Sequence, residues 1–407
     1  MTSAAEILKQ AQEMTAIPEL VPLVFRYADV KATPWVAKGF GLRGAVTILG
    51  ATGGTGKTQA TLQCAVAFAL GEDFGGFHPM RPLRTVFVSA EEPNDEIQRR
   101  LLAIAIDMVG DDEAKVNALM EKLEREKRLL IYHGKNVALV SKDGEKGAAV
   151  ARTAFHERIC LDAESGEFDV VILDPIARLH SGLDENASEM QELHNAADEL
   201  ARRGNCAVVL VHHTRKSSRG DVGDQYAARG ASAMTDAARV VLIMANMTED
   251  EAKIHLSADK QNERDRYCKI GDPKQSYAAN ARVRWFQKVP ITLPVLLEDN
   301  SPDARFVLRP WKPEAPDTLS QPWLPEFLDR IKKGPGGGAM YTTSRTGPKP
   351  PRADALLMDK FKVPKGQTAA VLRALVEAGE IVIRKRTQGT KGHEREVDVY
   401  EIGGLPF

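Results

Sequence analysis

Cysteine, long apolar runs and net charge are all scarce in this sequence. Its four cysteines are Cys64, Cys160, Cys206 and Cys268. They lie far apart and form no Cys-x-x-Cys pair, which argues against a disulfide framework or a zinc site and favours a reducing compartment. No apolar stretch approaches the roughly 18 residues of a membrane span, and the N-terminus lacks a signal-peptide pattern. We therefore expect a cytoplasmic protein without a membrane partner.

The charge balance limits how the protein can contact nucleic acid. The formal net charge is −1, so any such contact must use a local basic patch and not a global field. Hydrophobic residues make up 43% and charged residues 27% of the chain, which is the balance of a globular protein with a buried core.

The domain organisation follows from length and from the order of the patterns. With 407 residues the chain exceeds one ordinary core, so we expect a large and a smaller domain. Alternating strands and helices predict an α/β core at 35–315, with a twisted, mostly parallel sheet and helices on both faces. An N-terminal arm at 1–34 precedes this core, and a linker with a short helix at 316–350 follows it. At 351–407, two helices and a basic hairpin predict a winged helix–turn–helix domain.

The strongest motif is the run GATGGTGKT at residues 50–58. It follows the apolar strand 45–49 and precedes an apolar helix at 59–70, which is the context of a phosphate-binding loop. Lys57 can reach the β- and γ-phosphates, and the Thr58 hydroxyl can coordinate Mg²⁺. A glycine-rich turn with a chance Lys-Thr is the alternative, which the flanking strand and helix disfavour. The predicted nucleotide-binding residues are Gly53, Gly54, Thr55, Gly56, Lys57 and Thr58.

Carboxylates end two further apolar strands. Glu91 and Glu92 follow the strand at 84–90, where ligands bind in α/β sheets, so one of them could polarise the water that attacks the γ-phosphate. We assign this catalytic role to Glu91. The alternative, an acidic pair that complements a helix dipole, suits Glu92 better. Asp174 ends the strand at 168–174 and is predicted to bind Mg²⁺.

A histidine pair ends the next strand of the core. We interpret His212 as a structural strand-end residue and His213 as a sensor of the γ-phosphate. A zinc site is disfavoured because no Cys/His spacing completes it. The loop at 217–225 follows, and its polar residues fit either a contact with a phosphate backbone or a plain solvated loop. The cations that could make the contact are Arg215, Lys216 and Arg219.

Beyond the histidines, the apolar run at 240–244 predicts one more strand of the sheet. Antiparallel-looking edge strands are predicted at 253–258 and 282–286, and Lys260-Gln261-Asn262 lies between them.

The order of these pieces resembles the RecA/DnaB-type P-loop ATPase core. Within it, the chain looks most like the RepA-type hexameric replicative helicases of plasmids and phages, an AAA_25-like family. The resemblance covers residues 35–290. Its matching stretches are the phosphate loop, Ser89–Pro93, Leu173–Pro175, Val211–Lys216, Arg229–Ser232 with Asp236 and Arg239, and Lys260–Asn262 with Arg284–Phe286.

The resemblance implies a RecA-like fold and roles for single residues. It implies that Glu91 activates water, that Asp174 helps to hold Mg²⁺ and that His213 senses the γ-phosphate. Arg239 is the candidate arginine finger, acting on the site of a neighbouring subunit, and Arg100 is a second cation near the site. The predicted catalytic residues are therefore Glu91, Lys57, His213 and Arg239, and the metal ligands are Thr58 and Asp174.

One departure from the relatives affects the finger. DnaB-type relatives have Lys-x-Arg where this chain has Lys260-Gln261-Asn262, and Asn cannot supply charge. The finger role therefore moves to Arg239, with Arg229 in reserve. A finger from a neighbour requires self-assembly, and the resemblance implies a homo-hexameric ring.

We therefore expect an ATP- and Mg²⁺-dependent helicase or translocase that acts on single-stranded DNA in plasmid or phage replication. A replication-initiation or primase protein is the expected further partner. Two alternatives stay open. One is a RecA-like ATPase that remodels or recombines DNA without unwinding it. The other is a nucleotide-gated regulator that binds DNA through its winged helix.

Overall fold

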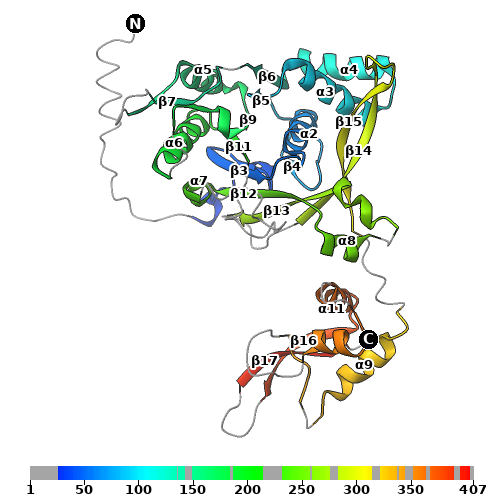
Figure 1. The fold of residues 1–407 in the computed structure, drawn as a ribbon. Helices are drawn as coiled ribbons and strands as arrows, with labels where there is room; N and C mark the ends of the chain where they lie inside the picture. The colour runs from blue at the N-terminus through cyan, green and yellow to red at the C-terminus, as the bar shows by residue number, and fades with distance from the viewer. Residues whose placement is uncertain are drawn as a thin grey trace. The chain divides into compact units, whose positions relative to one another are not determined.

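The fold is known from a computed structural model of the chain (Figure 1). The structure describes residues 26–134, 136–142, 149–183, 187–213, 232–256, 259–275, 283–313, 321–336, 339–343, 352–363, 367–388 and 395–403. Two compact units divide the chain, Met1–Pro34 and Trp35–Phe407. In the described part of the first unit, the only element is the short 3₁₀ turn Tyr27–Asp29.

A nine-stranded sheet forms the centre of the second unit, in the order β15-β14-β13-β12-β3-β11-β9-β5-β6 (Figure 1). The six strands from β12 to β6 are parallel to one another. They are β12 (Val240–Asn246), β3 (Ala45–Ala51), β11 (Ala207–His213), β9 (Val170–Asp174), β5 (Thr85–Ser89) and β6 (Leu129–His133). The three remaining strands are antiparallel: β13 (Tyr267–Gln275), β14 (Val283–Leu296) and β15 (Pro302–Trp311). The predicted α/β fold with a mostly parallel, RecA-like sheet is confirmed.

Helices cover both faces of this sheet because its central strands are apolar on both sides. In β9, Val170 and Ile172 pack into one hydrophobic cluster, while Val171 and Leu173 pack into the other. Strands buried on both faces require helices on both faces, as a parallel sheet does. The first cluster contains side chains of α2 (Lys57–Leu70), α3 (Asn94–Val109) and α4 (Glu113–Arg125). The second contains side chains of α5 (Ala154–Asp162), α6 (Ala187–Arg203) and α7 (Ser232–Ala237).

Short strands complete the core. One small sheet joins β1 (Trp35–Lys38), β2 (Gly41–Leu42) and β4 (His78–Pro79). Another joins β7 (Val140–Lys142), β8 (Val150–Arg152) and β10 (His180–Ser181). Among the described residues, no helix is long and apolar enough to cross a membrane.

The predicted edge strand at 253–258 is wrong. Most of this segment belongs to α8 (Glu249–His255). A capping box starts this helix, because the Thr248 hydroxyl accepts from the Glu251 backbone N–H while the Glu251 carboxylate accepts from the Thr248 N–H. The antiparallel partner of β12 is β13, which begins only at Tyr267.

The C-terminal elements have a hydrophobic core of their own. They are α9 (Leu324–Lys333), α10 (Ala353–Asp359), α11 (Thr368–Glu377), β16 (Ile381–Gln388) and β17 (Arg395–Ile402). The predicted order of helix, helix and hairpin is therefore present. Phe327 and Ile331 of α9 pack in the same cluster as Leu357 and Leu375 of the two later helices. Thus α9 belongs to this core, although the sequence analysis places it in a linker.

One buried side chain fixes the edge of the large sheet to α2. Gln63 donates to the Leu308 carbonyl at 3.1 Å and accepts from the Leu308 N–H at 2.7 Å. The outward N–H and carbonyl groups of Leu308 on the edge strand β15 are therefore paired with a helix side chain. They cannot bond to another strand.

We expect Gln63→Met to lower the free energy of unfolding by about 2 kcal/mol, because it leaves two buried backbone groups unpaired at nearly constant side-chain volume. Urea denaturation measures this loss, and hydrogen exchange should show faster exchange of the Leu308 amide. Gln98→Met at an exposed position of α3 is the matched control and should change stability by less than about 0.5 kcal/mol. Equal stability of the Gln63 and Gln98 variants would contradict the role of Gln63.

Candidate nucleotide-binding site

The loop between β3 and α2 has the geometry of an anion cradle. Gly54 and Gly56 have φ values of 75° and 104°, in the left-handed region that favours glycine. A Cβ at Gly56 would lie 3.2 Å from a ring carbon of Phe306, so this position also requires a small residue. No side chain caps the N-terminus of α2, so its first N–H groups can bind an anion.

Lys57 is the first residue of α2, and its side chain is almost fully buried. Its Nζ lies 3.1 Å from Nδ1 of His213 and 3.5 Å from the carbonyl oxygen of Thr52. Burial lowers the pKa of Lys57, while the nearby charges of Asp174 and Glu91 oppose that shift. A cation in this position gains from a phosphate anion, because the phosphate replaces solvation that the ammonium has lost.

Strand register brings His213 to this lysine. In the parallel pair of β11 and β3, His213 lies opposite Ala51, the residue that starts the loop. Burial and the charge of Lys57 lower the pKa of His213, which favours the neutral ring. A neutral ring that accepts from Lys57 at Nδ1 carries its proton on Nε2. That Nε2 lies 3.8 Å from Oε2 of Glu91, so His213 connects Lys57 with Glu91.

Asp174 and Thr58 form the part of the site that suits a metal ion. Burial raises the pKa of Asp174 to about 6, while a hydrogen bond with the Thr58 side chain and the charge of Lys57 oppose the shift. The Asp174 Oδ2 atom is buried and has no hydrogen-bond partner among the described residues. A carboxylate with a free oxygen beside a hydroxyl offers the hard oxygen ligands that Mg²⁺ prefers. These two residues therefore fit the predicted metal site.

The two adjacent glutamates have different surroundings. Glu91 is 42% exposed, and within the described structure its charged neighbours are His213 at 3.8 Å and Arg178 at 3.6 Å. Glu92 instead accepts from Arg100 at 2.7 Å, and burial, opposed by Arg100, raises its pKa. Arg100 is in turn held by Glu96 at 3.1 Å. Glu91 therefore lies on the Lys57 side of the site, whereas Glu92 is held in an ion network with Arg100. The catalytic role of Glu91 stays a prediction.

Arg178 is a cation of the site that the sequence analysis missed. It lies in the 3₁₀ turn Ile176–Arg178, directly after β9, and its side chain is 63% exposed. The signal in the sequence is its position four residues after Asp174, at the edge of the sheet where the other site residues gather.

Arg239 lies away from these residues. It precedes β12, and its N–H donates to the Val46 carbonyl at 3.3 Å. Because Val240 pairs with Thr47 and Met244 pairs with Ala51, Arg239 is more than four strand residues, or roughly 15 Å, from the loop. Any role as a finger therefore needs the site of another subunit and stays a prediction. Arg215, Lys216, Arg219 and Arg229 lie outside the described residues.

The part of the chain that contains this site matches a known protein family. Residues 19–219 match the family model described as AAA domain, a range that includes the phosphate loop, Glu91, Asp174 and His213. Among solved structures, the chain is similar to a KaiC-like protein from the hyperthermophilic archaeon Pyrococcus horikoshii. That similarity has 14% sequence identity and a TM-score of 0.39, and it covers 68% of this chain and 94% of that chain.

We expect Glu91→Gln to lower ATP turnover at least 10²-fold while nucleotide affinity stays within a few-fold, because a general base acts on the chemical step. Single-turnover hydrolysis and equilibrium binding of a fluorescent ATP analogue separate the two effects. Glu92→Gln is the matched control: the amide can still accept from Arg100, so turnover should fall less than about tenfold. The opposite ranking would move the base to Glu92.

Proposed function

We propose that this chain, a P-loop ATPase with an AAA-type domain, couples ATP hydrolysis to movement along single-stranded DNA and unwinds duplexes in plasmid or phage replication. The observation that carries the proposal is the contact of Lys57 with His213 at 3.1 Å. His213 is the last residue of β11, and the chain continues from it into Arg215 and Lys216. A phosphate that draws Lys57 away from His213 therefore acts directly on the start of the basic segment.

The hydrolytic step uses the residues at the edge of the sheet. Backbone N–H groups of the loop bind the β-phosphate, and Lys57 pairs with the β- and γ-phosphate oxygens. Thr58 and Asp174 would hold Mg²⁺, which neutralises part of the phosphate charge when it is bound. Glu91 accepts the proton of the attacking water. His213 then loses Lys57 as its donor and keeps Glu91 as its neighbour, so the presence of the γ-phosphate changes its hydrogen bonds.

Assembly and cofactor use are part of the same proposal. We assign ATP and Mg²⁺ as the cofactors and a homo-hexameric ring as the working state, in which Arg239 reaches the site of the neighbouring copy. Support comes from the position of Arg239, which is exposed and lies at the N-terminal end of β12, remote from Lys57 of the same chain. A replication-initiation or primase protein is the proposed further partner.

The regulator alternative has less support from the C-terminal elements. In the winged helix–turn–helix that we propose for them, α11 would read the bases. This helix contains one basic residue, Arg373, and no Lys, Asn or Gln, which are the residues that commonly contact base edges. In the hairpin, Arg384 and Arg386 both pair with Glu401, at 3.6 Å and 2.6 Å. Their charges are partly compensated within the hairpin and less available to phosphates.

We expect the wild-type chain to separate a forked duplex with ATP and Mg²⁺, and to bind oligothymidylate with strong salt dependence. Replacing both Arg215 and Lys216 with Ala should reduce the slope of log K against log salt by about 1.4, which corresponds to two lost contacts with single-stranded phosphates. DNA-stimulated ATP turnover and unwinding should be lost, while basal turnover stays within about twofold.

The matched control replaces Arg384 and Lys385 of the hairpin with Ala, and it should leave unwinding and the salt slope unchanged. If the hairpin variant loses DNA binding and the Arg215/Lys216 variant keeps it, the DNA contact belongs to the C-terminal elements and the regulator is favoured. DNA-stimulated hydrolysis without strand separation would favour the remodelling alternative.

A further inference from the structure

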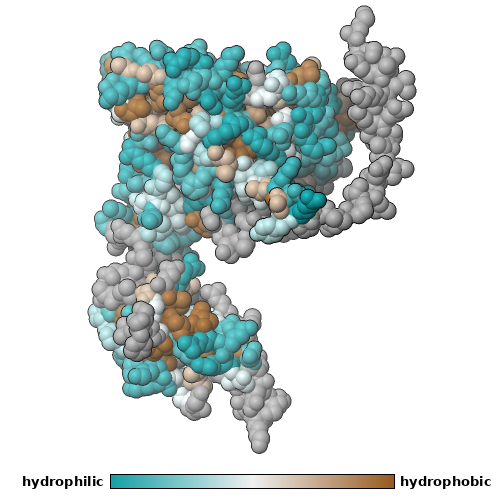
Figure 2. All heavy atoms as spheres, turned by 180° about the vertical axis from the view of Figure 1, so that it is seen from behind, coloured by the Kyte–Doolittle hydropathy of each residue, from teal (hydrophilic) through white to brown (hydrophobic). Residues whose placement is uncertain are grey.

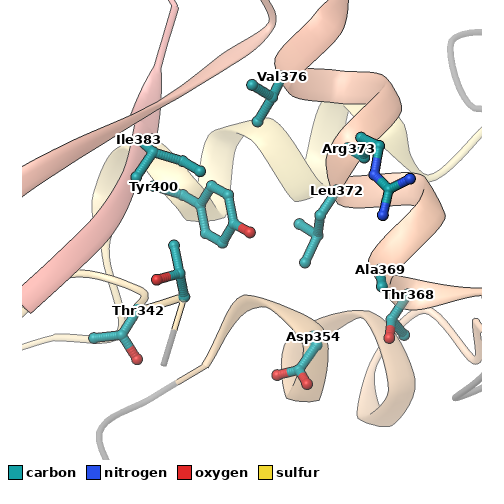
Figure 3. Close-up of a pocket in the computed structure, with 10 residues that line it drawn as sticks. Thr342, Asp354, Thr368, Ala369, Leu372, Arg373, Val376, Ile383 and Tyr400 are labelled. Atoms are coloured by element: carbon teal, nitrogen blue, oxygen red, sulfur yellow. The ribbon is translucent and has the colours of Figure 1, made fainter. Parts of the chain in front are cut away.

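A second site lies in the C-terminal elements, between α10, α11 and the β16–β17 hairpin (Figure 3). It is a pocket of about 290 Å³, close to the volume of one or two large side chains. None of its lining residues belongs to the nucleotide-binding site, and the proposed ATPase function gives it no role. A pocket of this size with both apolar and polar walls is a candidate binding site.

One wall of the pocket is apolar and partly open. Leu372 and Val376 contribute from successive turns of α11, and Ile383 of β16 faces them. Ile383 is 50% exposed, and its cross-strand neighbour Tyr400 turns its ring toward Leu372 (Figure 3). Figure 2 shows hydrophobic surface on these C-terminal elements. An isoleucine that stays half exposed beside a pocket gains stability when an apolar group covers it.

Among the described residues, the polar wall contains one hydroxyl group without a hydrogen-bond partner and one positive charge without an ion pair. The Thr342 Oγ1 atom is buried, and the described residues give it no hydrogen-bond partner. Asp354 is neutralised by Arg352, whose Nε donates to its carboxylate at 2.8 Å. Arg373 lines the pocket from α11 and is exposed, and no ion pair joins it to any residue that the structure describes. The pocket therefore presents a net positive charge beside an apolar wall.

Nucleic acid fits this surface less well than a peptide does. Tyr400 is 9% exposed, so its ring offers no open face on which a base could stack. Arg373 is the single basic residue of α11, which is too few for a phosphate track. A protein segment, in contrast, uses few charges and one buried anchor.

We propose that the pocket docks a short segment of a partner protein. The segment inserts one aromatic or large aliphatic side chain between Leu372, Val376 and Ile383, and a carboxylate next to that side chain pairs with Arg373. A backbone group of the segment satisfies the buried Thr342 hydroxyl. The partner is thus an acidic, apolar-anchored peptide, and the C-terminal elements recruit a protein.

N-acetylphenylalanine is the probe for this pocket, because it carries one aromatic side chain and one carboxylate. Methyl NMR of the full chain should show shifts at Leu372, Val376 and Ile383, with a dissociation constant on the order of 1 mM, as expected for so small a ligand. Arg373→Gln should weaken binding about fivefold, because it removes one exposed ion pair. The amide of the same probe should bind the wild type and the variant with equal, lower affinity. Arg330→Gln on α9 is the control and should leave all affinities unchanged.

Four outcomes would overturn the proposal. The first is the absence of NMR chemical-shift changes at these methyl groups, either when the probe saturates another site or when its concentration reaches the solubility limit. The second is equal binding of the acid and the amide to the wild type. The third is a shift of the same methyl groups by oligothymidylate, which would assign the pocket to nucleic acid. The fourth is a chemical-shift change at these methyl groups, in the absence of the probe, when Leu405 and Phe407 are replaced with Ser. That result would mean that the segment with Leu405 and Phe407 occupies the pocket.

Discussion

The contact of the buried Lys57 side chain with His213 is the interaction on which the site depends. An ammonium group in this position has lost most of its water, and burial lowers its pKa. Its partners come from three strands: His213 ends β11, Asp174 ends β9 and Glu91 follows β5. Because these strands are parallel and in register, their carboxyl ends meet at one edge of the sheet. The sheet therefore places a cation, a carboxylate that suits a metal ion and a base candidate next to the glycine loop.

The two neighbouring glutamates show how the surroundings, and not the residue type, separate the roles. Glu92 is tied to Arg100, which also contacts Gln59 at 3.4 Å, so its carboxylate is fixed to the α2–α3 side of the site. Glu91 lies 3.8 Å from His213 and 3.6 Å from Arg178, and a bound nucleotide could shorten or break these two contacts. A base must be able to approach its water, and of the two glutamates Glu91 is the one that no short ion pair holds in the described structure.

The residues that sequence reasoning found share one property: their chemistry follows from local order along the chain. The glycine loop, Asp174 and His213 each end or follow an apolar strand, and parallel strands bring such ends together. Arg178 was missed because its contact with Glu91 depends on the conformation of the turn after β9, and its position close to Asp174 is the only signal in the sequence. The sequence predicts a strand where α8 lies, because this segment has a weak period-2 pattern. The capping box of α8 outweighs that pattern and favours the helix. Gln63 was missed because its partner Leu308 is 245 residues away.

Linkage between nucleotide and DNA tests the coupling through His213 most directly. The affinity of a non-hydrolysable ATP analogue with Mg²⁺ is measured with and without oligothymidylate, for the wild type and for His213→Ala. We expect DNA to change the wild-type affinity by about fivefold or more, and the analogue to change the DNA affinity by the same factor. In His213→Ala the analogue should still bind, and this coupling should disappear. Equal affinities with and without DNA in the wild type, or unchanged coupling in the variant, would contradict a path through Lys57 and His213.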